Sequence, residues 1–96
     1  MSNIKRIKLE RHNDSIVRSQ NVCANCREEL GLLQSQMVDL YRHLDDVFND
    51  EYKVEQIHHE LELCKEQIRI FTDRFLFHKK NIKTEQRKAQ KYVEFC

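Results

Sequence analysis

The chain has 96 residues and a net charge of +1, with 34% charged residues, one glycine, no proline and no tryptophan. This length predicts one small domain at most. The composition is typical of long helices, because helix formers are abundant and helix breakers nearly absent. The N-terminal segment MSNIKRIKLER lacks the apolar core of a signal peptide. No apolar run reaches the ~18 residues of a membrane span. We therefore expect an intracellular protein of the cytoplasm or nucleus that is not secreted and does not bind a membrane.

Charge is distributed unevenly along the chain. Residues 27–66 carry four basic and eleven acidic side chains, a net charge of −7. The two flanking segments together carry thirteen basic and five acidic side chains, a net charge of +8. Basic ends therefore flank an acidic middle, a pattern that steers partners and does not specify a fold.

Residues 1–14 are predicted to form a basic N-terminal arm, because Asn13-Asp14-Ser15 is a favourable place for a helix to begin. A heptad helix is predicted over residues 15–48, where core positions recur at alternating intervals of three and four. These positions hold Cys23, Cys26, Leu30, Leu33, Met37, Leu40, Leu44 and Val47. The series extends backward more weakly through Ser19, Ile16, His12 and Leu9.

A second heptad helix is predicted over residues 54–82, followed by a basic helical tail over residues 83–96. The core positions of this second helix hold Val54, Ile57, Leu61, Cys64, Ile68, Phe71, Phe75, His78 and Ile82. The series continues more weakly into the tail through Glu85, Ala89, Tyr92 and Cys96. The two series differ in phase, which favours a turn over residues 49–53 and an antiparallel helical hairpin. In this hairpin, core residues that face each other across the two helices have numbers that sum to 101, as Leu40 and Leu61 do. One long coiled-coil helix is the alternative.

The second helix carries more apolar surface than its heptad core positions, the seam that faces the first helix, can bury. Leu63, Ile70 and Phe77 form an outer stripe at intervals of seven residues. We expect this stripe to drive homodimerisation into a four-helix bundle, or to hold a different helical protein. The predicted core and interface residues are Leu30, Leu33, Leu40, Leu44, Leu61, Ile68, Ile70, Phe71, Phe75 and Phe77.

The segment Cys23-Ala24-Asn25-Cys26 is a C-x-x-C sequence at two core positions of the first seam. The favoured interpretation is core filling, since a reduced cysteine behaves as a small buried hydrophobe. A zinc site of Cys23, Cys26 and His78 is an alternative that lacks a fourth ligand within the chain. A redox pair is a further alternative, but it needs a helix N-terminus, and these thiols lie two turns inside the predicted helix.

No sequence motif indicates catalysis. The chain has no glycine-rich phosphate loop and no G-x-S-x-G sequence, and its acidic pairs are typical of solvated helix faces. We therefore expect neither an enzyme nor a small-molecule substrate, and no cofactor other than the zinc considered above.

The sequence favours a non-catalytic coiled-coil oligomerisation and interaction module that acts as a structural, assembly, scaffold or adaptor protein. The alternative is a small dimeric nucleic-acid-binding regulatory protein that docks through its basic ends, because clustered lysines and arginines bind phosphates. The residues that carry this alternative are Lys5, Arg6, Lys8, Arg11, Lys79, Lys80, Lys83, Arg87, Lys88 and Lys91.

Overall fold

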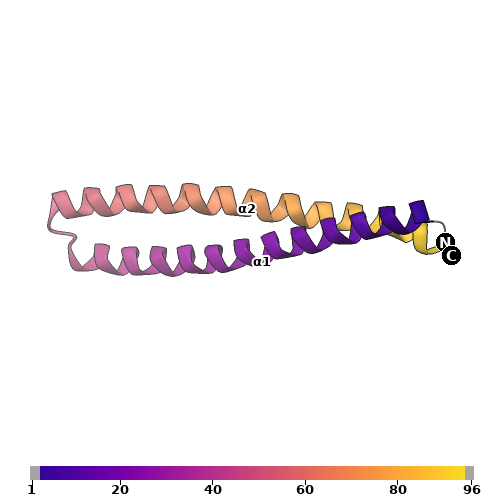
Figure 1. Cartoon of the computed structure of the whole chain (residues 1–96). Coiled ribbons are helices and arrows are strands. Elements are labelled where there is room, and N and C mark those ends of the chain that lie inside the picture. The colour runs from indigo at the N-terminus through magenta and orange to yellow at the C-terminus, as the bar shows by residue number, and fades with distance from the viewer. Residues whose placement is uncertain (1–2, 95–96) are drawn as a thin grey trace. The chain divides into compact units, whose positions relative to one another are not determined.

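The computed structural model of the chain describes residues 3–94 as two α-helices joined by a short turn (Figure 1). Helix α1 spans Asn3–Asp46 and helix α2 spans Glu51–Glu94. Side-chain contacts between residues far apart in the sequence, such as Ser19 with His78, show that the helices run antiparallel. The predicted all-α helical hairpin is therefore confirmed. The alternative of one continuous helix is wrong, because the change of heptad phase marks a reversal of the chain.

The turn between the helices comprises residues 47–50 and is closed by local hydrogen bonds. The amide of Val47 donates to the carbonyls of His43 and Leu44 at 3.1 and 3.3 Å, which ends α1. The Asp50 amide donates to the Val47 carbonyl at 2.8 Å. The Asp50 side chain then accepts a hydrogen bond of 3.2 Å from the amide of Lys53. Asp50 is therefore the N-cap of α2, an interaction that stabilises a helix by about 0.5–2 kcal/mol.

The helices are longer than the sequence predicts, and the turn is shorter and earlier. Helix α1 begins at Asn3, where a separate arm over residues 1–14 was expected, and it ends at Asp46 and not at residue 48. Helix α2 begins at Glu51 and not at residue 54, because Asp50 caps it. It continues through the expected tail over residues 83–96 as far as Glu94. Packing against the opposite helix extends both outer ends, since tertiary contacts outweigh the weak propensity of Asn13-Asp14-Ser15 to begin a helix.

Two compact units make up the chain. Unit 1 consists of Met1–Asn25 and Arg74–Cys96, and unit 2 consists of Cys26–Asp73. Unit 1 therefore pairs the first part of α1 with the last part of α2. Unit 2 contains the turn and the helical segments that flank it.

Unit 2 has an apolar seam. Cys26, Ile57, Leu61 and Cys64 are buried. The half-buried members are Leu30, Leu33, Met37, Leu40, Leu44, Val47, Val54, Ile68 and Phe71. These are the positions that the two heptad series predict for this part of the chain. Their burial between the helices is what holds unit 2 together, since each large apolar side chain contributes roughly 1.5–3 kcal/mol when fully buried.

Unit 1 has a seam in which polar and apolar side chains alternate. Ser19, Cys23 and Ala89 are buried. The half-buried members of the heptad series are Leu9, His12, Ile16, Phe75, His78, Ile82, Glu85 and Tyr92. His12 contacts both Glu85 and Tyr92, which lie on either side of Ala89 in α2. This placement agrees with the predicted register, in which the numbers of facing residues sum to 101. Cys96, the last predicted member, lies outside the described residues.

Candidate interaction surfaces

Eight of the predicted interface residues lie in the seam between α1 and α2. Leu61 is buried, and the others are half-buried. The seven half-buried residues are Leu30, Leu33, Leu40, Leu44, Ile68, Phe71 and Phe75. Because these side chains face the other helix of the same hairpin, they form its core. The surface that is open to another chain must come from side chains outside this seam.

The outer stripe of α2 is largely open to solvent. Phe77 is 69% exposed and Leu63 is 55% exposed, while Ile70 is half-buried. Leu76, beside Phe77, is exposed as well. An aromatic ring that is two-thirds exposed is a feature of interaction surfaces more than of stable cores.

Helix α1, the turn and the first turn of α2 contribute exposed apolar side chains that the sequence reasoning did not single out. Leu32, Val38, Tyr41, Phe48 and Tyr52 of unit 2 are all exposed. The sequence signal that could have found them is the presence of apolar residues at positions of 31–52 that do not belong to either heptad core series. Val38, Tyr41, Phe48 and Tyr52 do follow alternating intervals of three and four, but Asp45 interrupts the series, which weakens this signal.

A shallow groove crosses the seam of unit 2 beside Leu63. Its volume is about 150 Å³, and it is lined by Leu33, Gln36, Glu60, Leu63, Cys64 and Gln67. Leu33, Leu63 and Cys64 supply apolar surface, whereas the other three side chains are polar. The groove therefore offers an apolar contact edged by amides and one carboxylate, the arrangement of a small docking site.

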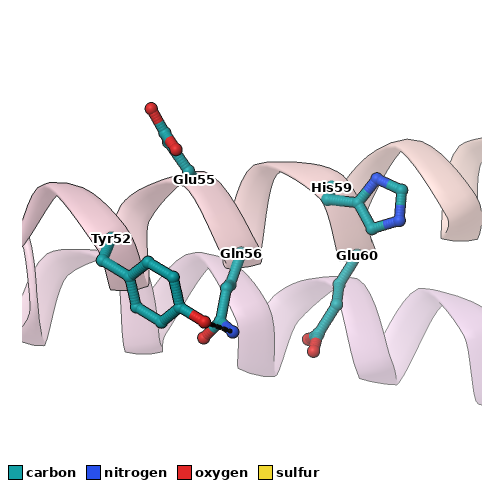
Figure 2. Close-up of a pocket in the computed structure, with 5 residues that line it drawn as sticks. All are labelled: Tyr52, Glu55, Gln56, His59 and Glu60. Atoms are coloured by element: carbon teal, nitrogen blue, oxygen red, sulfur yellow. Dashed lines mark hydrogen bonds between the residues drawn. The ribbon is translucent and has the colours of Figure 1, made fainter.

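A second hollow, of about 380 Å³, lies on α2 near the turn (Figure 2). It is lined by Tyr52, Glu55, Gln56, His59 and Glu60, all from one helix. The Gln56 amide donates to the Tyr52 hydroxyl at 3.1 Å. Figure 2 shows Tyr52, Gln56 and Glu60 directed to one side of α2, whereas Glu55 and His59 are directed away from them.

The cysteines of the C-x-x-C sequence are buried thiols in different units. Cys23, in unit 1, donates a weak hydrogen bond to the Phe75 carbonyl at 3.7 Å. Cys26, in unit 2, is 1% exposed. His78, the third residue of the zinc alternative, has its Nδ1 atom 3.1 Å from the Ser19 hydroxyl. Among residues 3–94, no group of three or more histidine, cysteine, aspartate or glutamate side chains is arranged to hold a metal ion.

The buried thiols predict a slow reaction with thiol reagents. Cys23, Cys26 and Cys64 are free cysteines buried in the seam, so a reagent reaches them only when the helices separate. In a Cys96→Ser chain, we expect labelling by a disulfide reagent to be much slower in buffer than in denaturant. Absorbance of the released thiolate measures both rates. Rapid labelling of the folded protein at one equivalent or more would contradict the core assignment.

A cluster of polar side chains occupies the seam of unit 1. The Asn81 amide donates to the Ser19 hydroxyl at 2.9 Å and to the Ser15 hydroxyl at 3.4 Å. Ser19 is 3% exposed, and its hydroxyl also contacts His78. Hydrogen bonding compensates for the cost of burying these groups, which is about 1–3 kcal/mol for an unpaired hydroxyl or amide. The cluster ties α1 to α2 through side-chain partners that fit one register.

A contact between His12 and Glu85 joins the helices one turn further along unit 1. His12 Nδ1 contacts a carboxylate oxygen of Glu85, and the two side chains are 22% and 13% exposed. The His12 ring stacks on Tyr92 with centroids 5.7 Å apart. The Lys88 ammonium lies 3.8 Å from the other carboxylate oxygen of Glu85. Glu85 is therefore a largely buried carboxylate whose main partner comes from the opposite helix.

All ten basic residues of the nucleic-acid hypothesis are exposed and belong to unit 1, so the hairpin gathers both chain ends into one basic unit. Unit 1 contains twelve basic and four acidic side chains, a net charge of +8. Unit 2 contains five basic and twelve acidic side chains, a net charge of −7. The boundary between the two units therefore coincides with the reversal of charge.

An exposed triad of charges stabilises the middle of α2. Arg69 contacts Glu66 at 2.6 Å and Asp73 at 3.2 Å. The hydrogen bond from Arg69, with the attraction of its charge, lowers the pKa of Glu66 below its ordinary value. Because the folded pKa is lowered, the pair stabilises the helix at neutral pH. This contribution is lost as the pH falls through the lowered pKa of Glu66.

Replacing the Arg69 guanidinium tests this triad. In an Arg69→Gln variant, we expect the pKa of the Glu66 carboxyl to rise toward the ordinary glutamate value, since its charged partner is gone. A carbon-detected NMR titration of the side-chain carboxyl resonances gives the pKa directly. Lys65→Gln is the control, because Lys65 pairs with Glu62 and leaves Glu66 with its partner. An unchanged Glu66 titration in Arg69→Gln would contradict the assignment.

Comparison with models of known protein families, with curated proteins and with solved structures finds no match to this chain. Within residues 3–94, neither helix contains an apolar stretch long enough to cross a bilayer.

Proposed function

We propose that the protein is a non-catalytic coiled-coil interaction module that associates through its helices, either with itself or with another helical protein. Scaffold or adaptor roles in an assembly follow from this activity. The observation that carries the proposal is the apolar surface left outside the seam of the hairpin, which includes Phe77, 69% exposed, and Leu63, 55% exposed, on α2.

The total exposed area supports this proposal. The chain exposes 7517 Å² to solvent. A folded monomer of 11.7 kDa is expected to expose about 5,900 Å². The excess of roughly 1,600 Å² per chain is larger than the ~800 Å² that each partner buries in a typical specific protein–protein interface. A partner that covers part of each hairpin therefore brings the surface to the value usual for a folded protein.

The three described cysteines support an intracellular location. Cys23, Cys26 and Cys64 are free thiols. Unpaired cysteines are usual in the reducing cytoplasm and nucleus, whereas small secreted domains pair them.

Molar mass tests the proposal. Size-exclusion chromatography with light scattering, in reducing buffer and over a range of protein concentrations, is expected to give the mass of a dimer or higher assembly that falls on dilution. A monomer at every concentration would contradict self-association. The search for a partner would then turn to a different helical protein.

A second candidate function, nucleic-acid binding, is favoured by the net charge of unit 1. This unit carries +8, and a basic patch of that size binds phosphates without sequence preference. Binding of a fluorescent duplex oligonucleotide at low salt tests it, with charge reversal at Lys79, Lys80, Lys83 and Lys88. Oligonucleotide binding that is strong in the parent and lost in the variant favours this function. Absence of oligonucleotide binding by the parent excludes it.

A further inference from the structure

We propose that the partner is a second copy of this chain, docked head to tail, so that unit 1 of each copy contacts unit 2 of the other. This inference rests on the proposed function, since it names the partner and the direction of the association. The contact at its centre places Phe77 of one copy in the groove formed by Leu33, Leu63 and Cys64 of the second copy.

Charge selects the direction of pairing. Two copies aligned in the same direction bring +8 against +8 and −7 against −7, whereas head-to-tail copies bring +8 against −7 twice. Packed helices lie about 8–10 Å apart, which is close to the Debye length of about 8 Å at physiological salt. The charges that border such an interface are therefore only partly screened. Like-charge juxtaposition at an interface is unfavourable, so the parallel arrangement is disfavoured.

The groove of unit 2 and the exposed ring of unit 1 match in size and chemistry. The groove has a volume of about 150 Å³ and an apolar surface formed by Leu33, Leu63 and Cys64. An apolar cavity of ~150 Å³ is large enough to take up a benzene ring. Phe77 presents such a ring, 69% exposed, on unit 1. Burying an aromatic side chain in a pocket with a polar edge is the arrangement that most often dominates binding energy.

The charged side chains that border the two surfaces are complementary. Glu60 lines the groove of unit 2. Lys80 follows Phe77 by three residues on α2 of unit 1, so both lie on one side of the helix. When the ring of one copy enters the groove of the other, the ammonium of Lys80 approaches the carboxylate of Glu60. The acidic Glu66 and Asp73 on the same helix are both paired with Arg69, which limits their repulsion between copies.

The contact is reciprocal and therefore closes. Each copy donates one Phe77 and receives one in its groove, as a two-fold symmetric dimer requires. The spacing of α2 fits this symmetry, because Leu63 and Phe77 lie seven residues on either side of Ile70. An antiparallel pair of α2 helices centred on Ile70 places each Phe77 at the level of Leu63 of the second copy. A dimer, and no open chain of molecules, is the expected product.

The test measures the dimer dissociation constant of the full chain by sedimentation velocity at about 50 mM and about 500 mM NaCl, where the Debye length falls from about 14 Å to about 4 Å. We expect the dimer dissociation constant to be at least about tenfold higher at high salt, because the attraction between units of opposite charge is screened. Association that strengthens with salt would overturn the head-to-tail direction while leaving the proposed self-association standing. Absence of any dimer would overturn both.

Matched variants test the contact itself. Phe77→Ala is expected to weaken dimerisation at least about tenfold. Phe48→Ala, which removes an equally exposed ring near the turn, is expected to change it less than about twofold. Lys80→Glu and Glu60→Lys are each expected to weaken dimerisation, and the two changes in one chain are expected to restore it. Equal effects of the two phenylalanine variants, or no restoration in the double variant, would overturn the proposed contact.

Binding of an oligonucleotide distinguishes a contact between copies from nucleic-acid binding by unit 1. If Lys80→Glu abolishes oligonucleotide binding and leaves the dimerisation constant unchanged, the charge of unit 1 serves nucleic acid and the proposed dimer is wrong. If dimerisation weakens in the absence of oligonucleotide, the charge acts between copies.

Discussion

Replacing Leu61 by alanine is expected to lower the free energy of unfolding by about 2–5 kcal/mol, the range for a buried leucine that leaves a cavity. Leu61 is 2% exposed and lies in the apolar seam of unit 2, where both helices contribute side chains. Small helical domains are usually stable by only a few kcal/mol, so this loss is a large fraction of the total. Urea unfolding followed by circular dichroism at 222 nm measures the change.

Leu32→Ala is the matched control, since it removes the same number of atoms from another leucine of unit 2. Leu32 is 61% exposed, so its truncation leaves no cavity within the hairpin. The two variants and the parent are compared at one protein concentration, because any dimer adds to the apparent stability. A Leu61→Ala variant as stable as Leu32→Ala would contradict the assignment of the seam.

Replacing His12 by alanine is expected to lower the free energy of unfolding by about 1.5–3 kcal/mol, the range for a hydrogen bond to a charged group. The substitution removes the partner of Glu85, whose side chain is 13% exposed, and it removes the ring stacked on Tyr92. In this variant the carboxylate of Glu85 keeps its contact with the ammonium of Lys88, at 3.8 Å. Burial of a poorly compensated charge is the main cost.

A double-mutant cycle separates this cost from loss of the ring. Glu85→Gln in the His12→Ala background removes the buried charge, so part of the lost stability is expected to return. Hydrogen exchange measured by NMR locates the effect, and amides of unit 1 are expected to lose more protection than amides of unit 2. Equal loss in both units, or no coupling between the two substitutions, would contradict the role given to the His12–Glu85 contact.

The heptad positions predict the fold because their chemistry is sufficient to place each helix face. The alternation from Cys23 to Val47 and from Val54 to Ile82 predicts the seam, and every one of these side chains is buried or half-buried. The change of phase between Val47 and Val54 predicts the reversal of the chain. The ends of the helices were harder to predict, because capping by Asp50 depends on one local hydrogen bond and the outer turns depend on packing against the opposite helix.

The surfaces were predictable only in part. Phe77 and Leu63 follow from their recurrence every seven residues, and both are exposed. Val38 and Tyr41 were missed because Asp45 interrupts the series that links them to Phe48 and Tyr52, and Leu32 lies outside that series. The polar contacts of unit 1 were missed as well, although Ser19, His78 and Glu85 occupy heptad core positions of both helices in the same unit. Polar residues at core positions of both helices were the signal that could have found them.

The difference in chemistry between the two seams has a thermal consequence. Exposing apolar surface raises the heat capacity, whereas exposing polar surface lowers it. Separation of the helices in unit 2, with its aliphatic seam, therefore carries a larger heat-capacity change than separation in unit 1, where Ser19, Asn81, His12 and Glu85 are paired. Because hydrophobic stabilisation weakens on cooling, unit 2 loses stability relative to unit 1 as the temperature falls. The balance between the two units is thus set by temperature as well as by sequence.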